Sequence, residues 1–131
     1  MILRDETQDL AILNEVFFRN AYRLPAGFAP LDVIIDIGAH IGCFAWACLT
    51  RMADTVVCYE PDPDNYRMLC KNLDAPRDRQ LVQVHRKAVW RADMPGPVSF
   101  LNKGPMSGMH YVSASGRLIV DTIGLDDVLK P

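Results

Sequence analysis

The chain has 131 residues, a formal net charge of −2, and a composition that is 50% hydrophobic and 23% charged. This length suits one domain with a modest core, and the composition is that of an ordinary globular protein. The weak charge gives no case for general binding of nucleic acid or anionic membranes. No stretch is long and apolar enough to span a bilayer, and the N-terminus carries acids where a secretory signal is basic. We therefore expect a cytoplasmic protein.

The cysteines are the first candidates for a metal or disulfide site. Cys43, Cys48, Cys58 and Cys70 are scattered along the chain without a C-x-x-C pair. A structural zinc site needs closer ligand pairs, and a disulfide framework suits a secreted protein. We expect buried, reduced thiols and no metal.

Residues 5–22 are predicted to form an amphipathic helix that flanks the domain. Asp5 and Gln8 have the spacing of a capping box. The predicted apolar side of the helix is Leu10, Leu13, Phe17 and Ala21, and the predicted polar side is Asp9, Asn14, Arg19 and Asn20. The helix would pack as a flap on a sheet edge; in an alternative interpretation, Tyr22 helps to close over a bound ligand.

The central feature is a strand, a glycine loop, a helix and a second strand that ends in an acid. Residues 33–37 form a short apolar run of the kind found in strands buried on both faces. The loop after this run contains Gly38 and Gly42, and a second apolar run over residues 55–59 leads to Glu60. This order is the plan of a nucleotide-binding βαβ unit.

The glycine spacing indicates which nucleotide fold this is. A dinucleotide fold would show G-x-G-x-x-G, whereas Asp36, Gly38 and Gly42 form D-x-G-x-x-x-G. This pattern resembles the first motif of class I methyltransferases that use S-adenosylmethionine. Gly38 would let the backbone approach the ligand closely. Glu60, roughly 20 residues past the glycines, could accept both ribose hydroxyls.

Two helices are predicted after these strands, over residues 42–51 and from Pro63 to Leu73. The first would direct its N-terminal N–H groups towards the methionine carboxylate of the cofactor. Asp62 is predicted to cap the second, with Pro63 at the first helical position. Capping alone explains an aspartate at position 62, without any ligand. A role of Asp62 near the adenosine would be additional.

The remaining elements are predicted to be short. A third strand covers residues 81–84 and extends towards Val89, with Val82 and Val84 on one face. Strands at 97–102 and 118–122 follow, and a helix begins at Gly124. The loop between these strands contains residues that either line a substrate mouth or form a solvated tip: Met106, Ser107, Met109, His110 and Tyr111.

Several of these segments together resemble the FkbM family of methyltransferases. They are V-I-I-D-I-G-A-H-I-G from Val33, Y-E-P-D-P-D-N-Y from Tyr59, Leu69, K-N-L from Lys71, A-V from Ala88 and T-I-x-L-D-D from Thr122. The resemblance covers nearly the whole chain. It implies a Rossmann-like class I fold with three αβα layers and methyl transfer from S-adenosylmethionine, typically to an oxygen of a small molecule or sugar.

The resemblance also implies a set of cofactor-binding residues. Asp36, Gly38, Ala39, His40 and Gly42 would form the cofactor loop; Glu60, followed by Pro61, would hold the ribose; and Asp62 and Ala88 would border the adenosine. His40 departs from the asparagine most usual in the family, although its ring nitrogens can still form hydrogen bonds.

The family pattern continues into a fourth strand beside the first, whereas this sequence ends at Pro131. We therefore expect a single partial domain over 1–131, truncated after the third parallel strand plus a β-hairpin. The open edge of the strand at 33–37 is an association hazard. It is predicted to be covered by a partner copy in a homo-oligomer, by the strand at 118–122, or by missing sequence.

The predicted function is methyl transfer to a small-molecule or sugar acceptor, without nucleic-acid or membrane partners. Nothing nominates a catalytic base: His40, His85 and His110 qualify only by residue type, and no catalytic residue is assigned. Two alternatives stay open. One is a catalytically inactive cofactor-binding or assembly module, and the other is a different nucleotide-binding Rossmann protein.

Overall fold

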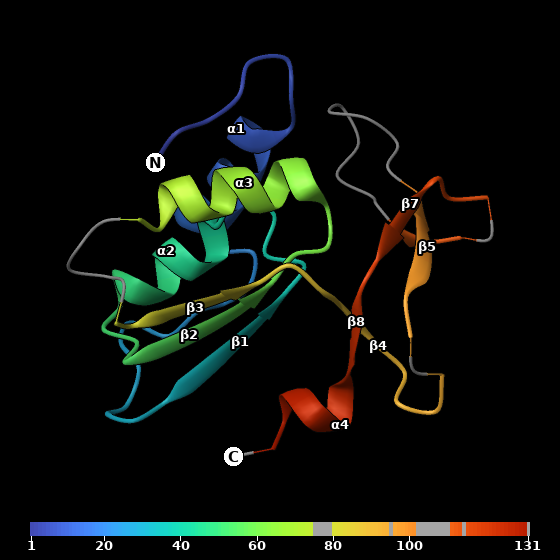
Figure 1. The fold of residues 1–131 in the computed structure, drawn as a ribbon. Helices are drawn as coiled ribbons and strands as arrows, with labels where there is room; N and C mark the ends of the chain where they lie inside the picture. The colour runs from blue at the N-terminus through green and yellow to red at the C-terminus, as the bar shows by residue number, and fades with distance from the viewer. Residues whose placement is uncertain (75–79, 95, 102–110, 114, 131) are drawn as a thin grey trace.

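The centre of the fold is a three-stranded parallel sheet with the order β1-β2-β3 (Figure 1). The structure is a computed structural model, and it describes residues 1–74, 80–94, 96–101, 111–113 and 115–130. The strands are β1 (Val33–Ile37), β2 (Thr55–Tyr59) and β3 (Val82–His85). Each strand runs parallel to its neighbour. The predicted mixed α/β architecture with a parallel sheet is confirmed.

Two helices connect these strands, and both lie over the same side of the sheet (Figure 1). They are α2 (Cys43–Leu49) and α3 (Pro63–Asn72). The core between helices and sheet includes Val56 and Cys58 of β2 and Leu69 of α3, all fully buried. In β1, Ile34 packs against this core. Because side chains alternate along a strand, Val33 and Ile37 point to the opposite face of the sheet, away from the helices. Val33 and Ile37 are accordingly 59% and 53% exposed.

The start of α3 follows the predicted capping arrangement. Asp62 Oδ1 accepts hydrogen bonds from the N–H groups of Asp64 at 2.9 Å and Asn65 at 3.0 Å. Pro63 occupies the first helical position, where its missing N–H costs nothing. The aspartate–proline pair therefore determines where this helix begins.

Replacing Asp62 with alanine is expected to lower the free energy of unfolding by about 1 kcal/mol, because two N–H groups lose their acceptor. Asp62→Asn keeps a side-chain oxygen in place and should cost clearly less. Urea unfolding of both variants measures the difference. Equal losses for alanine and asparagine would show that the cap does not act through this oxygen.

The prediction of one continuous helix over residues 5–22 is wrong. The structure has a short helix, α1 (Asp9–Leu13), followed directly by a π-helical segment, η1 (Asn14–Phe18). Glu6 and Asn20 have left-handed backbone angles, with φ of 55° and 44°. A right-handed helix cannot pass through such residues, so the helical segment lies between them. The helix N-cap is Gln8, which makes no side-chain cap bond, and the predicted capping box does not form.

The buried face of this segment differs in part from the prediction. Val16 is 2% exposed and packs on Ile41 and Ala47, whereas Leu10 is 68% exposed. Asp9, predicted on the polar side, is fully buried. Leu13 and Phe17 of the predicted apolar side do pack against this cluster. Asp9 and Leu10 both belong to α1, and Asp9 is buried together with its ion pair to Arg4, which helical spacing does not predict.

The later strands form two small sheets. β4 (Ala88–Trp90) pairs in parallel with β8 (Thr122–Gly124), and the short helix α4 (Leu125–Val128) follows. β5 (Val98–Leu101) pairs antiparallel with both β6 (Tyr111–Val112) and β7 (Leu118–Val120).

The predictions for these later strands are confirmed in one respect and wrong in another. The strands expected at 97–102 and 118–122 do pair with each other, as β5 and β7. The predicted extension of the third strand to Val89 is wrong. β3 ends at His85, and the Ala88 N–H donates to Asp121 O at 2.9 Å, which places β4 in another sheet.

One of the three predicted covers for the edge of β1 is also wrong. The strand at 118–122 is divided between β7 and β8, which pair with β5 and β4. A partner copy and additional sequence remain predictions. Within the described ranges, no helix is long and apolar enough to cross a bilayer. The predicted mouth residues Met106, Ser107, Met109 and His110, and the side chain of Tyr111, lie outside the part of the chain that is described.

Candidate functional site

The glycine loop begins where β1 ends. Gly38 and Ala39 donate backbone hydrogen bonds to the carbonyl oxygen of Tyr59 at 2.9 and 3.0 Å, which fixes the loop to the end of β2. Gly38 has a φ of 80°, and a Cβ added there would meet nothing within 4 Å. The backbone therefore borders open space at Gly38, as close approach by a ligand requires.

Gly42 has a different role in the same loop. Its φ is 93°, and an added Cβ would lie 3.0 Å from Leu69 Cδ1. Glycine at this position is explained by backbone conformation and by packing under α3. Of the two glycines predicted to bind the cofactor, only Gly38 borders free space.

Glu60 joins the glycine loop to the start of α3. Its carboxylate accepts the His40 N–H through Oε2 and the Asp62 N–H through Oε1, both at 2.8 Å. The side chain is 4% exposed, and this burial raises its pKa to about 7. A carboxylate has about four lone-pair directions. The side chain of Asn65 is a further hydrogen-bond partner of this carboxylate. Glu60 thus positions the loop, and about one lone-pair direction is left for another donor.

Asp36 is the second buried carboxyl group of the site. It is 8% exposed, and among the described residues its Oδ2 has no hydrogen-bond partner. Burial, with a smaller contribution from the negative charge of Glu60, raises the pKa of Asp36 to about 7. Buried polar atoms are almost always hydrogen-bonded in native proteins. A buried acceptor without a partner is therefore suited to a donor supplied by a ligand.

Asp36 lines a cavity of about 300 Å³ between the N-terminal segment and the glycine loop. One wall comes from β1 and the loop, and another from Cys43 and Phe44 of α2. The N-terminal segment supplies Ile12, Val16 and Tyr22. It thus forms part of the cavity wall. The ring of Tyr22 packs edge-on against Phe44 with centroids 5.0 Å apart; its closure over a ligand stays a prediction.

The structure brings most of the predicted site residues together and places Pro61 and Ala88 elsewhere. Hydrogen bonds and the cavity bring together those of the loop and of the segment after β2: Asp36, Gly38, Ala39, His40, Glu60 and Asp62. Pro61 lines a second cavity of about 190 Å³ with Arg86 and Asp121. Ala88 packs with Phe100 and Val120 in a small separate cluster. Its predicted place beside the adenosine stays a prediction.

Sequence reasoning missed two charged residues beside the loop. Asp9 accepts from the Arg4 backbone N–H at 2.9 Å and from the guanidinium Nε and Nη2 at 3.0 and 2.8 Å. Arg4 Nη2 also lies 3.2 Å from His40 Nε2. Burial acts to raise the pKa of Asp9, but the bonds and charge of Arg4 outweigh it and hold that pKa below its usual value. No spacing rule links these three residues, so the pattern gave little indication of them.

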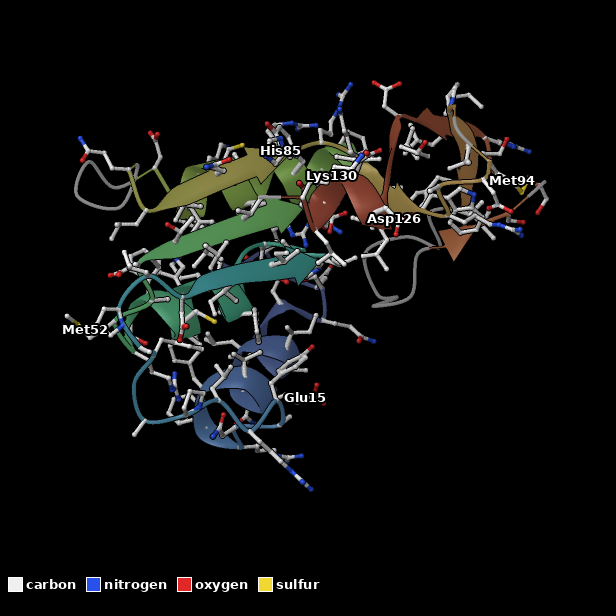
Figure 2. All side chains as sticks on the ribbon, turned by 90° about the horizontal axis from the view of Figure 1, so that it is seen from below. Glu15, Met52, His85, Met94, Asp126 and Lys130 are labelled. Carbon is white, nitrogen blue, oxygen red and sulfur yellow. The ribbon has the colours of Figure 1, made fainter. Side chains whose placement is uncertain are left out.

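The thiols match their predicted state, and His85 stacks on an aromatic ring. His85 lies at the end of β3 (Figure 2) and stacks on Tyr59, with ring centroids 4.9 Å apart. The four cysteines are free; Cys43, Cys48 and Cys58 are buried and Cys70 is partly buried. Burial raises the pKa of the Cys43 thiol to about 11, so this thiol is protonated and unreactive near neutral pH. The described residues contain no cluster of three or more metal-ligating side chains.

The chain is similar to hexuronic acid methyltransferase AglP of Haloferax volcanii, with 31% identity over 102 residues. The similar region covers 76% of this chain but only 39% of the relative, so the chain spans well under half of that protein's length. No protein-family model matches the chain, and no solved structure matches it significantly. The likeness to AglP relates the chain to a methyltransferase.

Proposed function

We propose that the chain binds S-adenosylmethionine beside the glycine loop, as the cofactor-binding part of a sugar O-methyltransferase with a class I Rossmann-like fold of the FkbM type. The arrangement of Asp36 and Glu60 carries this proposal. These two buried carboxyl groups come from the carboxyl ends of adjacent parallel strands and flank a glycine loop. In open α/β sheets, ligands bind at this end of the strands.

The residues around the cavity fit such a cofactor. A volume of about 300 Å³ is at the lower end of the range for small-ligand pockets. Asp36 Oδ2, which lines the cavity, would accept from the ammonium group of the methionine moiety, and Glu60, beside the loop, would accept from a ribose hydroxyl. S-adenosylmethionine, when bound, supplies a methyl group on a sulfonium. Asp36 and Glu60 would hold and orient this methyl donor. Correct alignment of donor and acceptor is the main requirement for an in-line displacement.

The proposed acceptor is a sugar, and a hexuronic acid in particular, because AglP carries that activity in its name. Since 61% of the relative lies outside the region of similarity (100 − 39), no residue here is assigned to the acceptor. We also assign no catalytic base. The ring of His40 contacts Arg4 and Asp9, and His85 stacks on Tyr59.

Calorimetric titration of the purified chain with S-adenosylmethionine, S-adenosylhomocysteine and NAD tests the proposal. We expect heat of binding from the two adenosyl ligands and none from NAD. Equal binding of NAD would favour a different Rossmann protein, and no binding at all would refute the cofactor site. Transfer of a labelled methyl group to free hexuronic acids is the second step. Binding without transfer would support the alternative of an inactive cofactor-binding module.

A further inference from the structure

The first nine residues form a strap that is fastened to the loop region at two places. At the first, Asn72 of α3 accepts the Ile2 N–H at 2.6 Å and donates to Ile2 O at 3.0 Å. The same amide group donates to Ile41 O of the glycine loop at 2.9 Å. One buried side chain thus connects the strap, α3 and the loop.

The second fastening holds His40 of the loop. Its backbone is left-handed, with a φ of 52°, a conformation that is unfavourable for a residue with a side chain. Its N–H is held by Glu60, and its ring nitrogen Nε2 lies 3.2 Å from Arg4 Nη2 and 3.6 Å from Asp9 Oδ1. His40 is therefore held from two sides, by the acid after β2 and by the strap.

The strap continues directly into the wall of the cavity. Asp9 begins α1, and the helical segment after it places Ile12 and Val16 against the same cavity that Asp36 and His40 line. Val16 is 2% exposed and packs on Ile41 of the loop. The position of the strap and the shape of the cavity are consequently linked through packed side chains.

We propose that Arg4 and Asp9 are positioning residues that hold His40 in its left-handed conformation, so that strap docking and cofactor binding favour each other. The identity of the ligand rests on the proposed function, whereas the positioning of His40 does not. Coupling of this kind is reciprocal: if the docked strap strengthens binding, binding must strengthen docking by the same factor.

Arg4→Gln, His40→Asn and the double variant test the coupling, with S-adenosylhomocysteine as the titrated ligand. We expect Arg4→Gln to weaken binding about five- to twentyfold, within the usual range of coupling between sites. The double variant should bind no more weakly than His40→Asn, because Arg4 acts through His40. Arg67→Gln is the matched control: Arg67 also pairs with an aspartate, Asp64, but both side chains are about two-thirds exposed. It should stay within about twofold of the wild type.

Arg4→Gln leaves Asp9 as an uncompensated buried charge and could lose stability for that reason alone. Arg4→Gln with Asp9→Asn removes both charges together and provides a folded alternative. Hydrogen exchange of the ligand-free chain gives a readout that general destabilisation does not imitate. We expect faster exchange of the His40 amide in this neutral pair, with unchanged exchange across β2.

The outcomes separate the two proposals. If the wild type binds and Arg4→Gln binds equally well, or if the effects of Arg4 and His40 simply add, the coupling is refuted and the cofactor site stands. If the wild type binds no adenosyl ligand, the proposed function falls and the coupling falls with it. The exchange of the His40 amide then still decides whether Arg4 and Asp9 position the loop; unchanged exchange would refute that as well.

Discussion

Replacing Glu60 with alanine is expected to weaken binding of S-adenosylhomocysteine by about tenfold or more. A hydrogen bond to a charged group contributes about 1.5–3 kcal/mol, and 1.4 kcal/mol corresponds to a factor of ten. The variant also releases the N–H groups of His40 and Asp62, both of which Glu60 accepts at 2.8 Å. The loop is therefore expected to lose its shape together with its ribose acceptor. Calorimetric titration measures the change in affinity.

Glu60→Gln separates these two contributions. Glutamine keeps one acceptor oxygen but presents an NH₂ group to the other N–H, so the loop should be partly retained. Asp64→Asn is the control, since Asp64 is an acid in the same segment with a side chain 66% exposed. It should leave the affinity nearly unchanged. If Glu60→Ala bound the ligand as tightly as the control, Glu60 would have no part in the site.

The elements that the sequence predicted correctly are those determined by neighbouring residues. β1 and β2 follow two short apolar runs, and a run of this length between turn residues indicates a strand. Of the two, β2 is the central strand of the described sheet, whereas β1 lies at its edge with Val33 and Ile37 exposed. The start of α3 follows from Asp62 and Pro63, whose effects act within one helical turn. The position of Glu60 next to the glycine loop was predictable because neighbouring parallel strands end at the same edge of a sheet, and Glu60 directly follows β2.

The wrong predictions concern features that depend on distant contacts. Asp9 belongs to a segment with helical spacing, and only its pairing with Arg4 and its contact with His40 make burial of its charge acceptable. β4 follows β3 after two exposed residues, yet it pairs with β8, more than thirty positions later in the chain. No local pattern contains such a pairing. The role of His40 is of the same kind, because its ring contacts come from the strap.

Stability is expected to fall as the pH rises from about 5 to 7.5, because burial raises the pKa values of Asp36 and Glu60 to about 7 in the folded protein. The unfolded chain releases these protons near pH 4, so between pH 4 and 7 the folded state binds more protons than the unfolded state. Under that condition the free energy of unfolding decreases with pH. It is highest below the unfolded pKa values, and the decrease ends once the folded values are passed. The slope is at most about 1.4 kcal/mol per pH unit for each group.

Asp36→Asn is expected to flatten this pH dependence. Asparagine removes one of the two titrating groups, and with it the group whose pKa the charge of Glu60 helps to raise. Urea unfolding at pH 5, 6, 7 and 8 measures the slope, with Asp64→Asn as a control that should retain it. A wild type that becomes more stable over this range, or a slope unchanged by Asp36→Asn, would contradict the assignment of Asp36.

The same titration should appear in ligand binding, with the opposite sign. An ammonium group binds a carboxylate more strongly than a neutral carboxyl group, so ionisation of Asp36 should strengthen binding of S-adenosylhomocysteine as the pH rises through about 7. Asp36→Asn should bind more weakly, with an affinity that changes little between pH 6 and 8. The wild type would then bind its ligand best where the free fold is less stable. This is expected of a buried carboxyl group whose missing partner is supplied by the ligand, since binding to the folded state restores stability by mass action.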